Sequence, residues 1–330
     1  MKILIVTLDN IGDTLISLAI HEALRRYPGY HTAFWTKEYS GGVIPLAGAD
    51  IEHYHCDPFW DRSPGTGKGG FLAYARTILK IRRAGFDAAL ILHSNWRKNL
   101  SCLLAGIGKR YAQKGAFSTH YAAPSTGNHE LDLCRALVSG LTGKDPGALS
   151  YPLTPAAYGE TEASARLFSN GAWAVLHPFS GNPRRNLPMV AWPPIVDSLL
   201  ARNMRVLVNA APAEKALFEA RFAGAAKPGD LVFSCDLGLD IRNLAYAVSR
   251  ARIFIGNNSG PLHLASALGT PCVGIFQKSW VEKIAPRGKS IPELAVFEND
   301  PSEIGAAEII AKAEMLLGPA KPRPGDNNNC

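Results

Sequence analysis

Residues 2–14 read KILIVTLDNIGDT, and this stretch decides the fold class. Residues 2–8 are largely apolar, as is typical of a parallel strand that is buried on both faces. A turn at Gly12 follows, and residues 14–27 carry apolar side chains at helical spacing. A second apolar strand is predicted at residues 31–36. Strand, glycine turn, helix and strand together form a βαβ unit, which predicts a parallel sheet.

Strands and helices alternate in the same way along the rest of the chain. Strands are predicted at residues 51–55, 87–92, 110–112, 173–176, 205–209, 231–233, 252–256 and 272–276, and helices at 71–84, 100–105, 128–141, 192–202, 213–223, 241–249 and 261–268. This alternation predicts an α/β fold with two doubly wound parallel sheets.

The length of the chain indicates two domains. A single hydrophobic core stops growing at about 250–300 residues, and this chain has 330. Residues 142–157 are rich in glycine and proline with little periodicity, which favours a linker. We therefore predict an N-terminal domain at residues 1–155, a C-terminal domain at 156–320 and a disordered tail at 321–330.

The net charge of +7 favours anionic partners: nucleotide sugars, phosphorylated glycans, anionic membrane surfaces or nucleic acid. The basic residues are dispersed and no standard nucleic-acid-binding motif is present, so we expect no nucleic acid among the partners. The six cysteines form no C-x-x-C pair, which predicts a reducing compartment and no structural metal.

Features of export and membrane insertion are missing from the sequence. No apolar run reaches the roughly 20 residues of a membrane span, and the first residues lack the pattern of a signal peptide. We expect a cytoplasmic protein, and leave open a peripheral contact with the cytoplasmic face of the inner membrane.

The strongest local signal for a ligand site is IGNNSGPLH at residues 255–263, where a predicted strand ends and a helix begins. Asn258 or Ser259 can cap the helix, and Gly260 lets the backbone approach a ligand. The free N–H groups of the first turn and the helix dipole suit a diphosphate, and His263 would point towards it. The alternative is an ordinary capped helix with a structural histidine.

Asp13 is the candidate catalytic residue. A carboxylate at a helix N-terminus is stabilised as an anion, and at the carboxyl end of a strand it can act as a general base on a hydroxyl group. The alternative is that Asp13 merely caps a helix that starts at Thr14. The loop has one glycine, Gly12, where a dinucleotide-binding fingerprint needs three.

Two further segments of the second half carry polar side chains after predicted strands. In HPFSGNPRR, residues 177–185, Ser180 can bind phosphate oxygens, and Arg184 or Arg185 can neutralise a leaving diphosphate. The alternative is a solvated basic loop. Glu214 can accept hydrogen bonds from a ribose, or is a carboxylate that favours the start of a helix.

The segment GTGKGG at residues 65–70 looks like a phosphate-binding P-loop, but that pattern would need glycine in place of Arg62 and serine or threonine in place of Gly69. We interpret it as a flexible loop that, with the basic helix after it, could hold an acidic acceptor. The alternative is a solvated helix face. The candidate acceptor-binding residues are Lys68, Arg76 and Lys80.

Taken together, these motifs resemble glycosyltransferase family nine, the ADP-heptose:lipopolysaccharide heptosyltransferases. The resemblance covers most of residues 1–300 and rests on IGDTL at 11–15, HPFSG at 177–181, NNSGPLHLA at 257–265 and ALGTPCVGIF at 267–276. It implies the GT-B architecture, in which two Rossmann-like domains face a central cleft, and an inverting reaction that needs no metal and no cofactor.

The resemblance also implies roles for individual residues. Asp13 would be the general base on the acceptor hydroxyl. The donor would be held at its diphosphate by Ser259, Gly260 and His263, at its phosphates by Arg185 and at its ribose by Glu214.

There are two departures from the family pattern. Asn258 stands where the family commonly has aspartate, and an amide can donate a hydrogen bond but cannot act as a carboxylate. Six residues separate Arg185 from Trp192, more than is usual in the family, which leaves Arg184 open as the basic contact.

The sequence thus predicts a metal-independent glycosyltransferase that moves a heptose or similar sugar from an ADP-linked donor to a hydroxyl of a lipopolysaccharide-core or related glycan. The N-terminal domain would bind an acidic or phosphorylated glycan or glycolipid, and the C-terminal domain the nucleotide sugar. Two alternatives remain: a nucleotide-sugar epimerase of the same fold, and a non-catalytic nucleotide-sugar-binding protein, which Asn258 keeps open.

Overall fold

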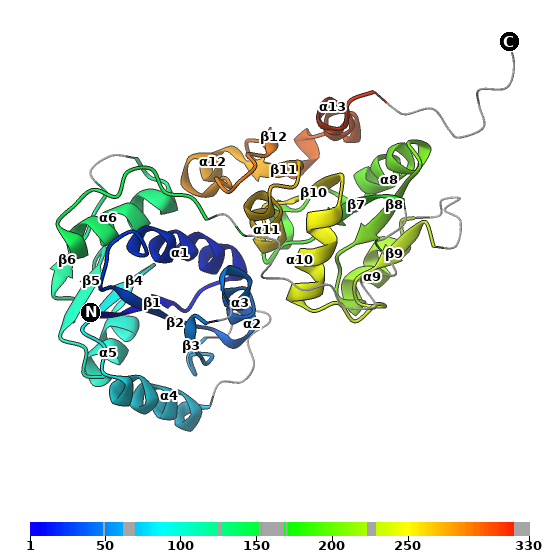
Figure 1. The fold of residues 1–330 in the computed structure, drawn as a ribbon. Coiled ribbons are helices and arrows are strands. Elements are labelled where there is room, and N and C mark those ends of the chain that lie inside the picture. The colour runs from blue at the N-terminus through cyan, green and yellow to red at the C-terminus, as the bar shows by residue number, and fades with distance from the viewer. Residues whose placement is uncertain are drawn as a thin grey trace, which may run out of the picture. The chain divides into compact units, whose positions relative to one another are not determined.

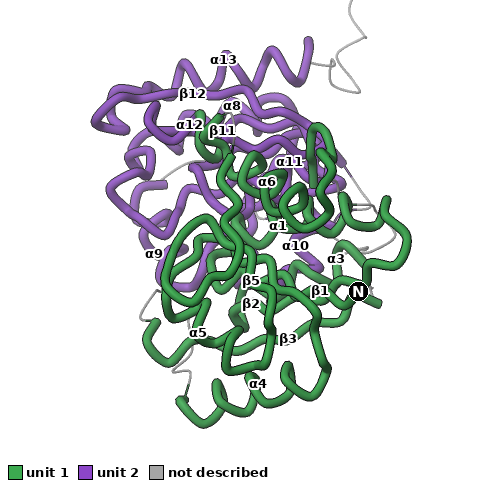
Figure 2. The backbone as a smooth tube through the Cα atoms, turned by 90° about the vertical axis from the view of Figure 1, so that its left-hand side faces the viewer, with its two compact units in different colours: residues 1–157, 282–284 green, residues 158–281, 285–330 purple. Residues whose placement is uncertain are grey.

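The protein forms two compact units in the computed structural model (Figures 1 and 2). Unit 1 comprises Met1–Ala157 and Glu282–Ile284, and unit 2 comprises Tyr158–Val281 and Ala285–Cys330. The structure describes residues 1–48, 50–61, 70–124, 127–151, 153, 168, 171–222 and 229–319. The predicted domain boundary between residues 155 and 156 and the predicted tail at 321–330 lie outside the described residues.

Unit 1 contains one parallel sheet with helices packed on it. Its strands are β1 (Lys2–Thr7), β2 (His31–Thr36), β3 (Glu52–His55), β4 (Ala88–Ile91), β5 (Lys109–Ala112) and β6 (His120–Tyr121). Its described helices are α1 (Ile11–Leu24), α2 (Glu38–Gly41), α3 (Ile44–Ala47), α4 (Phe71–Ala84), α5 (Trp96–Leu104) and α6 (Glu130–Thr142). The strand order is β3-β2-β1-β4-β5-β6, and each neighbouring pair is parallel.

The centre of this sheet is buried on both faces, as the apolar sequence of its strands predicts. Residues 3–6 of β1 and 88–91 of β4 are fully buried. On one face, Trp35 packs in the core with Tyr74 of α4, with ring centroids 5.4 Å apart. Helices α1 and α6 pack against each other.

Unit 2 repeats the same construction. Its strands are β7 (Ala172–His177), β8 (Met204–Val208), β9 (Leu231–Phe233), β10 (Ile253–Asn257), β11 (Cys272–Gln277) and β12 (Glu293–Phe297). Its described helices are α8 (Trp192–Ala201), α9 (Pro212–Glu219), α10 (Ile241–Arg250), α11 (Gly260–Leu268) and α13 (Ala306–Leu317), while α12 (Lys278–Ile284) spans a boundary between the units. The short 3-10 helices are η2 (Pro183–Arg185), η3 (Met189–Ala191) and η4 (Pro301–Glu303). The strand order is β12-β11-β10-β7-β8-β9, again parallel throughout.

The two sheets share one topology. When strands are numbered within each unit, both follow the order 3-2-1-4-5-6 of the Rossmann fold. The order reverses between β1 and β4 in unit 1, and between β7 and β10 in unit 2. Ligands of open α/β sheets bind beyond the carboxyl ends of the strands at such a switch point. The predicted fold of two Rossmann-like, doubly wound parallel-sheet domains is confirmed.

Several elements differ from the sequence-based prediction. Helix α5 begins at Trp96, four residues before the predicted start, because the Asn95 side chain accepts a hydrogen bond from the Lys98 N–H and caps the helix there. Among the described elements, those that the sequence did not predict are α2, α3, β6, α12, β12, α13 and the 3-10 helices η2, η3 and η4. Among the described helices, none combines the length and the apolar character that a membrane span requires.

Candidate functional site

Asp13 lies in the first turn of α1. The helix begins at Ile11 with Asn10 as its N-cap, so the alternative that Asp13 caps a helix starting at Thr14 is wrong. The Asp13 carboxylate accepts a hydrogen bond from the Asn10 N–H at 3.1 Å. Asp13 thus stands at the third helical position, where a carboxylate stabilises the start of the helix and faces its positive end.

Charged side chains from four segments of unit 1 gather around this position. The imidazole of His93 lies 3.4 Å from Asp9 through Nδ1 and 2.8 Å from Glu130 through Nε2. The Lys98 ammonium lies 2.6 Å from Asp9 and also donates a hydrogen bond to the Leu92 carbonyl. We call the five residues of this site the acid–histidine cluster: Asp9, Asp13, His93, Lys98 and Glu130.

The topology of unit 1 brings the cluster together. Asp9 follows β1 and His93 follows β4, and these strands are neighbours at the switch point of the sheet. Lys98 comes from α5, and Glu130 begins α6. His93 has a φ of +42°, which lies in the left-handed region that residues other than glycine rarely adopt. Such a conformation costs on the order of 1–3 kcal/mol and is concentrated at functional sites.

The cluster holds His93 as a cation. Burial is the largest influence on its pKa and would lower it. The bonds to Asp9 and Glu130 and the negative charges of Asp9 and Asp13 together outweigh burial and raise the pKa of His93 to about 10. For Asp9, burial acts to raise the pKa, but the charges of Lys98 and His93 outweigh it and hold the pKa below its usual value.

The same surroundings raise the pKa of Asp13. Burial is the main cause, and the carboxylates of Asp9 and Glu130 add to it, whereas His93 and the Asn10 N–H oppose it. A carboxylate with a raised pKa is a stronger proton acceptor. The cluster therefore makes Asp13 a candidate general base.

Sequence reasoning found Asp13 but missed its partners Asp9, His93, Lys98 and Glu130. His93 could have been found, because it directly follows the predicted strand at residues 87–92, next to the first strand in a Rossmann order. Glu130 had no such signal, because its place depends on how α6 packs against α1.

In unit 2, the helix start that the sequence predicted is present at α11. Ser259 occupies the N-cap position, but its hydroxyl donates to the Asn257 carbonyl at 2.9 Å and makes no hydrogen bond to a helix N–H. The Asn258 N–H pairs with the Ile275 carbonyl of β11. Gly260 begins the helix, and His263 is buried within it. The Ser259 side chain thus does not cap the first turn, in which Pro261 has no N–H and the Leu262 and His263 N–H groups donate to the Ser259 carbonyl. An anion at this helix start would be held by the Gly260 N–H and the helix dipole.

Asn257 joins this helix start to the loop after β7. Its buried side chain accepts a hydrogen bond from the Leu187 N–H at 3.0 Å and donates one to the Pro178 carbonyl at 2.5 Å. Beside it, a Cβ on Gly256 would lie 3.0 Å from the His177 carbonyl oxygen, so the close approach of β10 and β7 requires glycine. Asn257 is the first residue of the NNSGPLHLA motif, and its position in the sequence did not indicate this bridging role.

The loop after β7 carries the predicted phosphate-binding residues. The Ser180 hydroxyl donates to the Asn186 side chain at 2.6 Å and to the Asn182 carbonyl at 3.1 Å. Arg184 and Arg185 lie in η2. Arg184 is exposed, whereas Arg185 is half-buried and its guanidinium stacks on the ring of Trp280, 4.5 Å from its centroid. Of the two arginines, Arg185 is the one whose position the fold fixes.

The remaining predicted residues fall into three groups. The Glu214 carboxylate accepts a hydrogen bond from the Ala211 N–H at 2.8 Å in the first turn of α9, so one of its oxygens stabilises the helix start. Arg76 and Lys80 are exposed on α4. Lys68 lies outside the described residues.

Within the described part of the chain, no group of His, Cys, Asp and Glu side chains is arranged to hold a metal ion.

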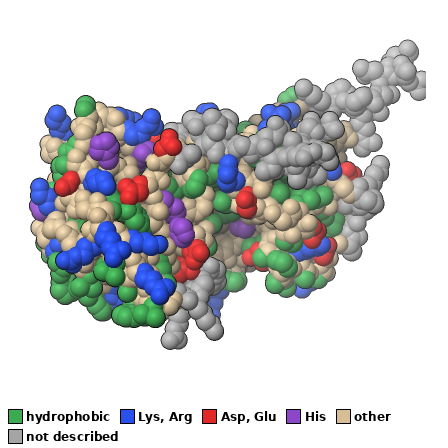
Figure 3. Space-filling view, turned by 60° about the horizontal axis from the view of Figure 1, so that its bottom comes forward, with side chains coloured by type: hydrophobic (Ala, Val, Ile, Leu, Met, Phe, Trp, Pro, Cys, Tyr) green, Lys and Arg blue, Asp and Glu red, His purple; other side chains and the backbone are tan. Residues whose placement is uncertain are grey.

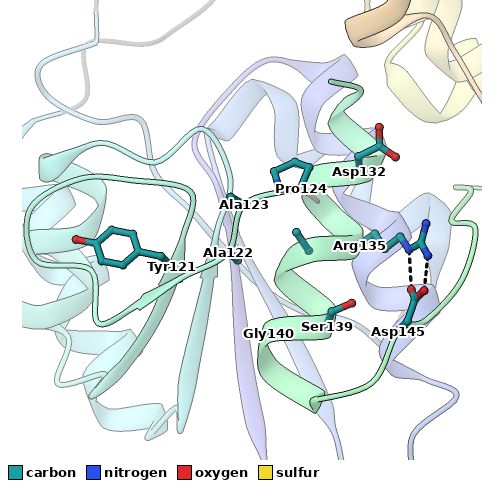
Figure 4. A pocket seen from close by; sticks show the side chains of 10 residues that line it. Tyr121, Ala122, Ala123, Pro124, Asp132, Arg135, Ser139, Gly140 and Asp145 are labelled. Carbon is teal, nitrogen blue, oxygen red and sulfur yellow. Dashed lines mark hydrogen bonds and ion pairs between the residues drawn. The ribbon is translucent and has the colours of Figure 1, made fainter. Parts of the chain in front are cut away.

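A separate pocket of about 440 Å³ lies in unit 1 beside β6 and α6 (Figure 4). Its lining includes Arg135 and Asp145, whose side chains form a bidentate ion pair. The residues described as lining it include no member of the acid–histidine cluster and none of the predicted site residues.

Comparisons with solved structures show the same fold. The family 9 glycosyltransferase from Veillonella parvula has a TM-score of 0.78 at 17% identity, with 96% of this chain and 97% of that chain covered. The E. coli heptosyltransferase WaaC with ADP has a TM-score of 0.73 at 16% identity, with 96% and 100% covered. The predicted GT-B architecture is thereby confirmed.

Comparisons of sequence identify the family. Among curated proteins, a Haemophilus influenzae protein named "Putative glycosyltransferase" is 30% identical over 115 residues, which is 34% of this chain and 32% of the relative, so the match spans about a third of the relative's length. The family model described as glycosyltransferase family 9 (heptosyltransferase) matches residues 74–305, more than half of the chain. The chain therefore belongs to glycosyltransferase family 9, the heptosyltransferase family, and is a glycosyltransferase.

Proposed function

We propose that this glycosyltransferase moves a heptose, or a similar sugar, from an ADP-linked donor to a hydroxyl group of a lipopolysaccharide-core or related glycan. The observation that carries the proposal is the acid–histidine cluster, which places a carboxylate of raised pKa, Asp13, at the switch point of unit 1. The WaaC structure named above holds ADP, which supports ADP as the nucleotide.

In the proposed reaction, Asp13 accepts the proton of the acceptor hydroxyl while that oxygen attacks the anomeric carbon of the donor. The bond between the sugar and the diphosphate breaks on the opposite face, so the configuration inverts. When Asp13 is ionised, two cations, His93 and Lys98, face three carboxylates in the cluster, which leaves one excess negative charge. That excess disappears when Asp13 takes the proton, so the cluster favours proton transfer.

Unit 2 is proposed to hold the donor. The N-terminus of α11, at Ser259 and Gly260, would bind the diphosphate through backbone N–H groups, with His263 and Ser180 as further contacts. Arg185, fixed on Trp280, would neutralise the departing ADP. Glu214 would contact the ribose, and the Asn258 amide would donate a hydrogen bond to the diphosphate or the sugar. In this scheme the reaction uses no metal and no cofactor.

Unit 1 is proposed to bind the acceptor. The exposed Arg76 and Lys80 of α4, together with Lys68, would attract acidic or phosphorylated groups of the glycan. We expect the protein to act in the cytoplasm and to use a nucleotide sugar as its donor.

The test combines a binding panel with a transfer assay. Thermal stabilisation is measured with ADP, UDP, GDP, CMP and their sugar conjugates. A ligand that binds only the folded protein stabilises it by about 2.7 kcal/mol at 100 times its dissociation constant. Selective stabilisation by ADP species supports the proposed donor. Selective stabilisation by UDP or GDP species overturns it, and conversion of the donor without any acceptor would favour the epimerase.

The role of Asp13 is tested with Asp13→Asn, which keeps an oxygen for the Asn10 N–H. Loss of a general base lowers kcat by roughly 10²–10⁴-fold, while the affinity for ADP stays unchanged. Asp132→Asn is the matched control, because Asp132 accepts the His129 N–H at the same 3.1 Å in the first turn of α6. Full transfer activity in Asp13→Asn would refute the assignment.

A further inference from the structure

Two neighbouring helices of unit 1, α4 and α5, expose large apolar side chains. Single exposed apolar residues are normal on protein surfaces, whereas a contiguous group of them marks an interaction site. The exposed fractions are 64% for Phe71, 68% for Leu72, 51% for Leu79, 50% for Trp96, 40% for Leu103 and 53% for Leu104. We call the surface formed by these six side chains the α4–α5 face.

The two helices pack against each other, so their exposed sides form one surface. The Tyr74 hydroxyl donates a hydrogen bond to the Ser101 hydroxyl at 3.0 Å, and Arg82 donates one to the Leu104 carbonyl at 3.2 Å. Figures 1 and 2 both show α4 and α5 together at the edge of unit 1. Phe59, itself 46% exposed, extends the apolar surface, because its ring lies 5.3 Å from that of Phe71.

The charges on this surface are all positive. Neither α4 nor α5 contains an acidic residue. Exposed cations lie among the apolar side chains at Arg76, Lys80, Arg82 and Arg83 of α4 and at Arg97 of α5, whose guanidinium lies 5.0 Å from the ring of Trp96. Figure 3, which brings this side of the molecule forward, shows a band of Lys and Arg side chains bordering an area of hydrophobic ones.

We propose that the α4–α5 face binds the surface of an anionic lipid bilayer. Apolar side chains interleaved with cations are the pattern of helices that lie in a membrane interface, where the apolar groups enter the acyl boundary and the cations contact anionic headgroups. A second copy of the chain is a poorer fit, because it would bring two cationic faces together. This inference concerns membrane attachment and does not depend on which sugar is transferred.

The orientation of α5 relates membrane attachment to the acid–histidine cluster. The same helix exposes Trp96, Leu103 and Leu104 on its outer side and turns Lys98 inward, where it pairs with Asp9 of the acid–histidine cluster. On the proposed function, a glycan acceptor anchored in the bilayer would reach the protein beside the helix that supplies Lys98 to the cluster.

The experiment is co-sedimentation of the full chain with vesicles of phosphatidylcholine alone and with added phosphatidylglycerol. The protein should bind the anionic vesicles and leave the neutral ones largely unbound. Arg76→Gln with Lys80→Gln should lower the partition coefficient by roughly 30-fold, which corresponds to about 1 kcal/mol for each cation. The charge control is Arg242→Gln with Arg250→Gln, which removes two exposed cations from α10 of unit 2.

The apolar contribution needs a separate pair of variants. Leu72→Ser with Leu79→Ser should lower binding at least 10-fold, since each leucine loses the free energy of burial in the acyl boundary. Leu217→Ser with Ile291→Ser, which are 61% and 78% exposed in unit 2, should leave binding unchanged. All four variants should melt at the wild-type temperature, because the substituted side chains are exposed.

Three outcomes would overturn the proposal. One is a lack of binding to anionic vesicles. Another is equal loss of binding in the unit 2 controls, which would indicate an unspecific effect of charge or hydrophobicity. The third is a dimer in solution that Leu72→Ser with Leu79→Ser converts to a monomer, which would assign the face to a second copy.

Discussion

Replacing His93 with glutamine should remove a stabilising cation whose effect depends on pH. In the folded protein the ion pairs with Asp9 and Glu130 raise the pKa of His93 from 6.5 to about 10. Each pH unit of such a difference corresponds to about 1.4 kcal/mol, so full coupling would stabilise the fold by about 5 kcal/mol. The His93 side chain is 31% exposed, and screening by water reduces the effect to about 2–3 kcal/mol.

The direction of the pH dependence follows from the raised pKa. The stabilisation is fully present below pH 6.5, where folded and unfolded protein both carry the proton, and it is lost as pH rises towards 10. His93→Gln should therefore be less stable than the wild type by about 2–3 kcal/mol below pH 6.5, and the two proteins should approach each other near pH 10. His31→Gln, at an exposed histidine of the same unit, is the control.

Urea denaturation at several pH values measures the stability difference, and an NMR titration of the histidine side chains measures the pKa of His93 directly. A His93 pKa near 6.5, or a stability difference that stays constant with pH, would refute the reasoning. The catalytic profile gives a second readout. His93 lowers the pKa of Asp13, so the acid limb of kcat/KM should move to higher pH in His93→Gln, which a purely structural role would not cause.

Three further substitutions test unit 2. Asn257→Ala leaves two buried backbone groups without partners and should lower the free energy of unfolding by about 2–4 kcal/mol in urea titrations. An unchanged free energy of unfolding would exclude the bridging role of Asn257. Gly256→Ala should cost about 1–3 kcal/mol in the same assay because its Cβ meets the β7 backbone, and a neutral result would mean that the strands can move apart. Arg185→Lys should weaken ADP binding about 10-fold in calorimetry through loss of the stacked guanidinium, whereas Arg184→Lys should not; equal effects would contradict the distinction.

The sequence was a good guide wherever periodicity and turn residues agree. The buried strands at residues 2–8 and 272–276 and the helix at 71–84 could be located, because apolar runs and helical spacing are local properties. Helix α13 at Ala306–Leu317 and strand β12 at Glu293–Phe297 were missed near the C-terminus, where the sequence analysis assigned no elements. Helix starts were less predictable, since Asn10 and Asn95 define them through caps that only the structure shows.

The candidate site divides in the same way. Asp13 and Ser259 could be found because each stands after a strand and next to a glycine. The partners of Asp13 come from four segments, and their charges act together only because α5 and α6 bring Lys98 and Glu130 to the end of the sheet. A raised pKa depends on burial and on neighbouring charges, which motif spacing does not encode.

The two switch points have opposite electrostatic characters, and this contrast supports the proposed division of donor and acceptor between the units. In unit 1 three carboxylates outnumber two cations, an arrangement that repels a diphosphate but suits a proton acceptor. In unit 2, burial lowers the pKa of His177 to about 4 and keeps it neutral, and the uncapped start of α11 and Arg185 favour an anion. Asn258 fits this division, because an aspartate there would add a negative charge beside the proposed diphosphate site. Asn258→Asp should therefore weaken ADP binding, and tighter binding would show that a carboxylate at this position serves the sugar instead.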